Sequence, residues 1–327
     1  GQQVDAANTT AGDQTSNPGG QGGTSQNASS QQQGGSVRVA GAIGGTVLRP
    51  SVTATIAGGV TVDATGELKL AATSDTDAST LATGLAYAKD AKTGVGAAVA
   101  VNYADLNNAA TIGDGAVITA GSVSVEAGST VGQRNDFMNM AFAGGGAAQE
   151  SDGQGEQQGS GGGTTAVAGA VGVNVVVSHT TAHIGAATVT ANAGDVDVTA
   201  RRDLGVQNVV GGGARTQGKS GSNDTSIGLA IGFNWVDATA DASIAGGATI
   251  TNTTPASAGD IRVIADTSVS APSIPIPDIP LIDWQPDIKV SNLVAGASIG
   301  TASGWAVAGS AAVNVVQSST HARLGGG

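Results

Sequence analysis

The sequence contains no cysteine and few aromatic or charged side chains. Among its 327 residues cysteine is absent, aromatic residues make up 2% and charged residues 12%. Without cysteine, the chain can form no disulfide and can hold no cysteine-ligated zinc or iron–sulfur centre. The charged share lies well below the roughly 25% typical of a soluble domain. The scarcity of large side chains argues against the packed core of a globular enzyme.

Two further features restrict the partners that we expect. No run of 18 consecutive apolar residues occurs, so we expect no membrane insertion of this segment. The formal net charge is −12, and an acidic chain is repelled by phosphate backbones and by anionic lipid. We therefore expect no nucleic-acid partner. The same charge is expected to discourage side-by-side association of copies.

Small residues are abundant, and the apolar residues alternate. Glycine and alanine contribute 53 and 57 residues, about a third of the chain. In the segment 194–200 valines alternate with Asp195, Asp197 and Thr199, which predicts a strand with one apolar and one wet face. Glycine and asparagine interrupt these runs, so the pattern predicts short strands of about four to seven residues.

An internal repeat organises the chain. An asparagine between apolar residues is followed ten residues later by an aliphatic residue that has alanine two positions before it. A glycine then precedes an aliphatic–aliphatic–alanine alternation. The asparagines are Asn102, Asn174, Asn234 and Asn314, and a degenerate earlier copy has Thr46 at this position. So many positions in phase indicate a tandem array of units of about 60–80 residues.

Short strands broken by glycine predict an all-β β-solenoid with protruding loops. If one rung needs about 20 residues, each unit supplies two or three rungs, and roughly a dozen rungs make a rod about 60 Å long. The repeated asparagines are then buried amides that bond to neighbouring backbone. Successive copies would lie roughly 10–15 Å apart, too far to form one continuous ladder.

The array is flanked and interrupted by segments of different composition. Residues 1–35, rich in Gln, Ser and Gly, are predicted to be a disordered linker, and 36–327 the solenoid array. We expect units at about 36–93, 94–163, 164–224, 225–303 and a truncated 304–327, with loop insertions at 144–163, 211–224 and 271–289. Because the array stops in mid-unit, we expect the chain to be part of a much longer one.

The repeat resembles the repeat regions of large Gram-negative secreted and surface adhesins, of the filamentous-haemagglutinin and autotransporter-passenger class. The clearest matches are VNVVVSHTTAHIGAATVTANAGDVDVTA at 173–200 and FNWVDATADASIAGGATI at 233–250. The resemblance implies a right-handed parallel β-helix, export to the cell exterior or bacterial cell surface, and work in adhesion or filament formation, as in virulence or biofilm. The expected partner is a receptor or glycan on a host or neighbouring cell.

The proline-rich insertion carries the candidate binding residues. Trp284 lies between Asp283 and Asp287 in this segment, and a rigid aromatic side chain on a loop is a good binding anchor. The segment could equally cover apolar side chains of the solenoid. The other tryptophans, Trp235 and Trp305, occupy strand positions and are expected to pack.

Catalysis and metal binding have weaker support. The densest charged cluster is Asp195, Asp197, Arg201, Arg202 and Asp203. Carboxylates on adjacent rungs serve polysaccharide lyases and hydrolases of the β-helix class, but a solvated outer face explains this cluster as well.

No cofactor is expected. An incidental calcium ion at Asp195 and Asp197, or at Glu150, Asp152 and Glu156, is the only metal that the pattern admits. His179 and His183 share one strand face about 13 Å apart, too far to chelate one ion.

The sequence thus predicts a non-catalytic extracellular adhesin or filament segment, a solenoid stalk that displays loops for attachment to a cell surface or matrix. Two alternatives stay open. One is a β-helix polysaccharide lyase or hydrolase, and the other is a passive structural spacer of a surface filament.

Overall fold

The computed structural model describes residues 21–30, 37–88, 92–148, 164–217, 223–253, 259–271, 291–300 and 304–325. Within these ranges every regular element is a β-strand, and the strands pair in parallel. The prediction of an all-β chain is therefore confirmed. The described residues include no helix of the length and hydropathy that crossing a membrane requires.

Three sheets, which we name A, B and C, are built from segments that recur in the same order. Sheet B contains β2 (Val37–Leu48), β3 (Ser51–Ile56), β7 (Thr93–Ile112), β11 (Thr165–Ile184), β14 (Thr225–Ile244) and β18 (Trp305–Leu324). Sheet C contains β4 (Thr61–Asp63), β8 (Val117–Ala120), β12 (Thr188–Ala191) and β15 (Thr249–Asn252). Sheet A contains β1 (Gln21–Ser30), β5 (Glu67–Ser74), β6 (Asp77–Ala88), β9 (Ser122–Ser129), β10 (Asn135–Ala148), β13 (Val196–Gln217), β16 (Ile261–Ser270) and β17 (Asn292–Ile299).

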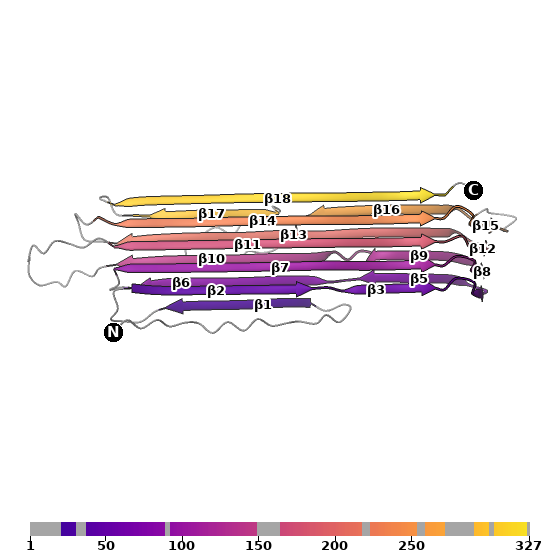
Figure 1. The fold of residues 1–327 in the computed structure, drawn as a ribbon, viewed down its shortest axis with the longest axis horizontal. Coiled ribbons are helices and arrows are strands. Elements are labelled where there is room, and N and C mark those ends of the chain that lie inside the picture. Colours follow the sequence, from indigo (N-terminus) through magenta and orange to yellow (C-terminus); the bar gives the residue numbers. More distant parts are fainter. Residues whose placement is uncertain are drawn as a thin grey trace, which may run out of the picture.

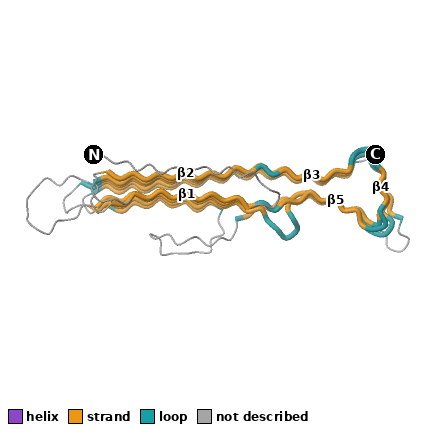
Figure 2. Tube along the Cα trace, turned by 90° about the horizontal axis from the view of Figure 1, so that it is seen from below, coloured by secondary structure: helices purple, strands orange, loops and turns teal. Residues whose placement is uncertain are grey.

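The chain passes from sheet B through sheet C to sheet A and then returns to sheet B. Such passages, here called circuits, begin at β2, β7, β11 and β14, and β18 returns to sheet B after the fourth. The long strands of sheets A and B run side by side across the molecule (Figure 1). Seen at a right angle, sheets A and B form two close layers, and the short strands of sheet C close one end (Figure 2).

Each repeat unit therefore supplies one circuit, and the prediction of two or three rungs per unit is wrong. The strands β7, β11, β14 and β18 are each 20 residues long, not four to seven. Such a strand spans about 65 Å, whereas five strands stacked at about 4.8 Å rise only about 24 Å. The long dimension thus lies along the strands and not along a stack of a dozen rungs.

The error has a physical cause in the interior of the molecule. Glycine and asparagine, which the sequence pattern marks as strand breaks, instead point inward and continue the strands. In β7 the buried residues include Gly94, Gly96 and Asn102, while Val95 and Val99 face outward. The two-residue alternation therefore continues through positions that seem to interrupt it.

The interior changes in character along the strands. Near sheet C, where three sheets meet, the core holds larger aliphatic residues such as Ile112, Ile184 and Val198. At the other end of the long strands the buried cluster is almost entirely alanine. Between these two clusters a third one holds Leu106, Phe137 and Leu204, so the interior narrows toward the end remote from sheet C.

Sheets A and B approach each other to backbone contact where glycine lines the interior. A Cβ atom added at Gly212 would lie well inside van der Waals contact of the Leu229 carbonyl oxygen. The same conflict arises between Gly228 and the carbonyl oxygen of Ala297. At these positions no larger residue fits without separating the two layers.

Gly212→Ala should therefore destabilise the chain by about 3 kcal/mol, near the upper end of overpacking costs. Its matched control is Gly213→Ala, the next residue on the same strand, whose added Cβ meets nothing within 4 Å. The control should be neutral or stabilise by up to about 1 kcal/mol through the unfolded state. Urea denaturation of both variants measures the difference, and equal midpoints would contradict the close approach.

The repeated asparagines form a ladder inside sheet B. Asn102, Asn174, Asn234 and Asn314 are successive partners in the strand register. The Nδ2 atom of Asn174 donates to Oδ1 of Asn234 at 3.0 Å, and Asn234 donates to Asn314 at 2.9 Å. The prediction that these amides are buried and bond to backbone is correct for Asn102, Asn174 and Asn234, whereas Asn314 is exposed on β18. The prediction that they cannot form a ladder is wrong.

A second set of asparagines extends from sheet A. Asn139, Asn208 and Asn292 donate to backbone carbonyl oxygens of sheet B, as from Asn208 to Gly172 at 2.8 Å. In the opposite direction, Asn174 donates to the carbonyl oxygen of Gln207 in sheet A at 2.8 Å. Side-chain amides thus connect the two layers in both directions, because a glycine- and alanine-lined interior lets them reach the opposite backbone.

Replacing one interior asparagine should cost more than replacing an outer one on the same strand. Asn102 is buried, donates to the Met138 carbonyl oxygen at 2.6 Å and accepts from Thr80 Oγ1, so Asn102→Ala should cost about 1–3 kcal/mol. Asn107→Ala, at an exposed position of β7, should stay within about 0.5 kcal/mol. The measurement is the free energy of unfolding. Similar losses for both variants would refute the stabilising role of these buried amide contacts.

Two segments predicted to lie outside the array contribute strands. Gln21–Ser30 forms β1 and pairs with β6, so a disordered linker does not extend over all of residues 1–35. Gly211–Gln217 belongs to β13 and Gly144–Ala148 to β10, although both were assigned to insertions. The reason is again that glycine is an interior strand residue here. The remainder of insertion 144–163 lies outside the described residues.

Candidate functional site

The predicted binding residues Trp284, Asp283 and Asp287 lie outside the described residues, as do Glu150, Asp152 and Glu156. A hollow lies between the end of β16 and the start of β17. It is bordered by Ala271 and Ser291 and reaches the ladder residues Asn234 and Asn314.

The predicted cluster at Asp195 is split between the two faces of sheet A. Asp195 and Asp197 lie on the outer side, where Arg262 of β16 pairs with both and its Nε atom lies 2.8 Å from Asp197 Oδ1. Arg201 lies on the same side at 3.7 Å from Asp266. Arg202, by contrast, points into the interior and is fully buried. The cluster therefore does not converge on one site.

Asp195 and Asp197 line an open depression in the outer surface together with Glu67, Ser122 and Ser124. Partial burial raises the pKa of Asp197, and the neighbouring carboxylates of Glu126, Asp260 and Glu67 raise it further. The described residues contain no group of three or more acidic or histidine side chains arranged to hold a metal ion.

Within the described ranges, Arg202 is a buried cation without a carboxylate partner. Its Nε atom donates to Thr180 Oγ1 at 3.0 Å and its Nη2 atom donates to Asn108 Oδ1 at 2.8 Å, whereas its Nη1 atom has no hydrogen-bond partner among the described residues. Burial lowers the pKa of Arg202 to about 10. The charged form is therefore destabilised by folding, and neutral amide and hydroxyl groups compensate only part of that cost.

Arg202→Met should raise the free energy of unfolding by about 1–2 kcal/mol at pH 7, because an apolar residue of similar length removes the buried charge. A lowered pKa means that the folded wild type releases this proton before the unfolded chain does, so its stability rises with pH above about 10. The advantage of the variant should shrink over that range. Denaturant titrations at pH 7 and above pH 10 test both expectations.

The matched control is Arg201→Met, on the adjacent outward position. Its pair with Asp266 is largely exposed, so the change in stability should stay below about 0.5 kcal/mol at either pH. Destabilisation by Arg202→Met at pH 7 would contradict the cost assigned to the buried charge.

The histidines occupy the places that the sequence predicts and form no common site. His179 and His183 share the outer face of β11, and His321 on β18 occupies the register position of Thr181. His183 Nδ1 lies 2.9 Å from Ser243 Oγ on the next strand.

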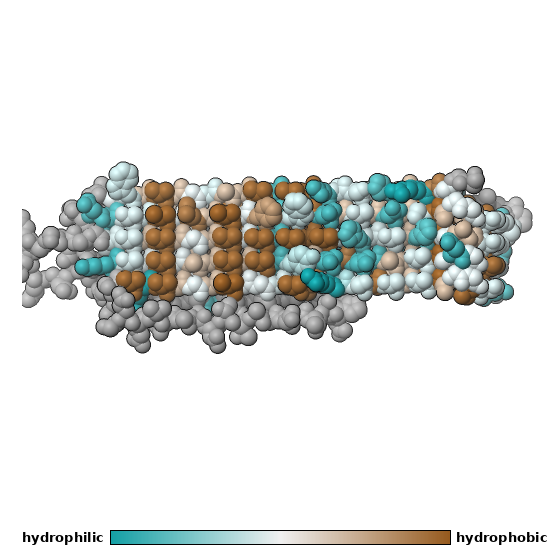
Figure 3. All heavy atoms as spheres, in the orientation of Figure 1, coloured by the Kyte–Doolittle hydropathy of each residue, from teal (hydrophilic) through white to brown (hydrophobic). Residues whose placement is uncertain are grey.

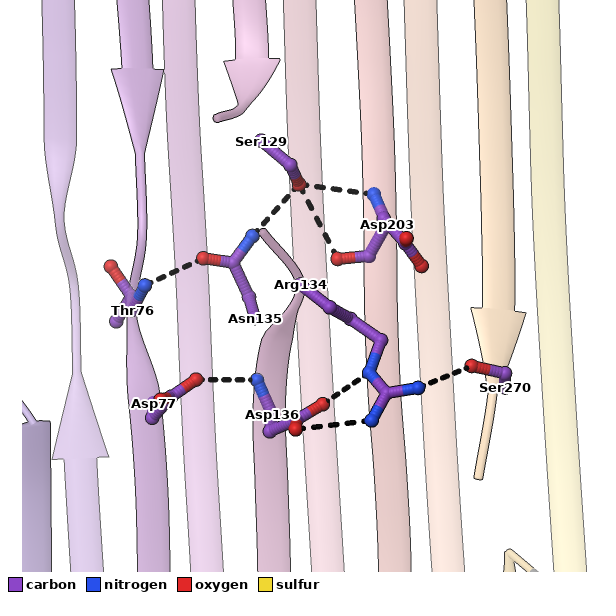
Figure 4. A network of polar contacts seen from close by, with 8 residues as sticks. All are labelled: Thr76, Asp77, Ser129, Arg134, Asn135, Asp136, Asp203 and Ser270. Atoms are coloured by element: carbon purple, nitrogen blue, oxygen red, sulfur yellow. Dashed lines mark hydrogen bonds and ion pairs between the residues drawn. The ribbon is translucent and has the colours of Figure 1, made fainter. Parts of the chain in front are cut away.

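An acidic pair that the sequence analysis missed lies in the middle of sheet A, where β5–β6 and β9–β10 are interrupted (Figure 4). Asp77 and Asp136 are adjacent in the register, and the Asp136 backbone N–H donates to Asp77 Oδ1 at 2.8 Å. Arg134 pairs with Asp136 through two nitrogens and also donates to Ser270 at 3.2 Å.

Asp77 and Asp136 differ in their electrostatic surroundings. Burial, with a contribution from the neighbouring Asp136 and Asp75, raises the pKa of Asp77. Two neighbouring carboxyl groups, one of them with a raised pKa, are the residue types that glycosidic acid–base catalysis uses. The pair was missed because the two residues lie at different distances from the aligned alanines of their repeats. Asp77 follows Ala72 by five residues and Asp136 follows Ala127 by nine, so a four-residue insertion hides their alignment.

Buried polar contacts join three circuits at this interruption. Asn135 donates to Ser129 Oγ at 2.9 Å and accepts from the Thr76 backbone N–H at 2.6 Å. Ser129 Oγ in turn accepts from the Asp203 backbone N–H at 3.0 Å (Figure 4). The strand breaks are therefore fixed in place by side chains, which also hold Asp77 and Asp136.

The most extensive feature of the surface is apolar. Sheet B presents an outer region, here called the apolar band, made of the outward-facing alternate residues of segments 39–47, 95–103, 167–175, 227–235 and 307–315. None of these residues is charged. Figure 3 shows them as apolar columns that cross the strands over the half of sheet B remote from sheet C.

The apolar band is exposed, so over this part of sheet B the apolar side of the strands faces outward. Ile43 is 60% exposed and Val47 52% exposed. Trp235 lies half-buried within the band. Trp305 lies at the edge of the band, at the start of β18, and is 78% exposed. Both tryptophans were expected to pack, and of the two only Trp235 is partly buried. The buried asparagine was the available signal, because its valine neighbours must face outward when it faces inward.

No protein-family model, curated protein or solved structure matches this chain.

Proposed function

We propose that the chain is a segment of a right-handed parallel β-solenoid that acts without catalysis in adhesion or filament formation outside a bacterial cell. The repeat unit supports the solenoid assignment, because each copy adds one circuit in the register of the previous one. The sequence resemblance supports the handedness and the extracellular setting. A receptor or glycan on a host or neighbouring cell is the proposed partner.

The observation that carries the proposal is the large number of residues in each circuit. The ladder asparagines of successive circuits are 60 and 80 residues apart, yet each circuit raises the stack by only about 4.8 Å. A passive spacer would gain height with far fewer residues per circuit. The long strands add width instead, and they repeat the same surface on every circuit. Repeated weak contacts of this kind give avidity.

The proposal predicts binding to polymers without their degradation. Purified chain would be incubated with dextran, alginate and polygalacturonate and then separated by size-exclusion chromatography, with polymer length measured in parallel. Co-elution with at least one polymer at unchanged polymer length is the expected result. Absence of co-elution with all three would count against a glycan partner.

A polysaccharide hydrolase is the second candidate, and the pair of Asp77 and Asp136 is the observation that favours it. Under this alternative a polymer becomes shorter during incubation, and Asp77→Asn abolishes the shortening. Asp63→Asn, on β4 in sheet C, is the matched control and should have no effect. Shortening that Asp77→Asn abolishes would overturn the non-catalytic proposal.

A further inference from the structure

We propose that the apolar band is a self-association surface on which a second copy of this chain packs face to face, with its strands antiparallel to those of the first. This inference goes beyond the proposed function and requires only the described surface. The band is flat, uncharged and exposed, and large exposed apolar patches mark interaction sites.

The area of the band suits a stable dimer. Five outward columns spaced about 6.7 Å apart, on five strands spaced about 4.8 Å apart, cover about 800 Å². Two such faces in contact would bury about 1,600 Å² in total, the size of a standard specific protein–protein interface. The band alone is thus large enough for a dimer.

The charges on the same face determine the direction of packing. Asp105 and Asp237 occupy the column immediately beyond the band, on the side toward sheet C. If the strands of the two copies ran parallel, the acidic columns would face each other. In the antiparallel arrangement each acidic column lies beyond the partner's band, so the net charge of −12 does not oppose contact at the band itself.

The shapes of the columns favour the same arrangement. The second column of the band contains Gly41, Ala97 and Gly169, and the fourth contains Val101, Val173 and Phe233. Antiparallel packing about the central column places the second column of one copy against the fourth of the other. Small residues then lie opposite larger ones on β7, β11 and β18, while Gly41 meets Gly45 on β2 and Leu229 meets Phe233 on β14. Parallel packing instead places Gly169 against its own copy and leaves a gap at the centre of the column.

The outer columns and the central column are paired by the same antiparallel arrangement. The first column, which includes Val167, would face the fifth, which includes Val175 and Trp235. The central column, which includes Val171 and Ile231, would face its own counterpart. Each column therefore has a defined partner that can be tested one residue at a time.

Sedimentation equilibrium of the full chain tests the association. We expect a mass of twice 31.2 kDa. Val171→Lys, at the centre of the band, should raise the dissociation constant by about 100-fold or more, because the two-fold symmetry inserts two unpaired charges. Thr181→Lys, on the same strand and face but outside the band, should leave the dissociation constant unchanged. Circular dichroism verifies that both variants fold.

Cross-linking tests the direction. The chain has no cysteine, so single substitutions can be read without ambiguity. A mixture of Val167→Cys and Val175→Cys chains should cross-link with a short bismaleimide, while Val167→Cys alone should not. Cross-linking of Val167→Cys to itself would overturn the antiparallel arrangement.

Two outcomes would overturn the self-association itself. One is a chain that stays monomeric over the full concentration range. The other is a dimer that Val171→Lys leaves intact, because another surface would then form it. If a monomeric wild type bound zwitterionic phosphatidylcholine vesicles and Val171→Lys did not, a lipid surface would replace the second copy. None of these measurements involves a polysaccharide, so their failure and the failure of the proposed function are distinguishable.

Discussion

In-register parallel pairing places equivalent residues of successive repeats directly above one another, and the rest of the structure depends on this constraint. A residue type that is acceptable once must be acceptable four or five times in a column with a spacing of about 4.8 Å. Inside, the constraint is met by glycine and alanine, which let the layers meet, and by asparagine, which bonds to its own copies. Outside, it turns single valines into continuous apolar columns.

Stacking explains which parts of the fold could be predicted from the sequence. The phase of Asn102, Asn174, Asn234 and Asn314 predicted a tandem all-β array, and the same residues are neighbours in the register. The length of a circuit could not be predicted, because it depends on whether a glycine such as Gly96 ends a strand or lies inside one. The low strand propensity of glycine predicts that the strand ends there. The close approach of the opposite layer's backbone instead requires glycine inside the strand.

The candidate sites show the same limitation. Arg202 stands next to Arg201 in the sequence, yet one is a buried cation and the other a surface partner of Asp266. A two-residue alternation predicts that neighbours face opposite ways but does not decide which side is the interior. Asp77 and Asp136 come together only because β10 resumes after an insertion, and no local pattern marks the two residues as partners.

The asparagine ladder has a consequence for how the chain can vary in size. Asn234 bonds to an identical amide on each side, accepting from Asn174 and donating to Asn314, so an added copy at this place would meet the same group on both sides. A gene that gains or loses one whole repeat would therefore change the height of the stack by one circuit and leave the remaining amide contacts as they were. A change of part of a repeat would instead place an apolar residue opposite an amide. The height of the stack would therefore vary between related genes only by whole circuits.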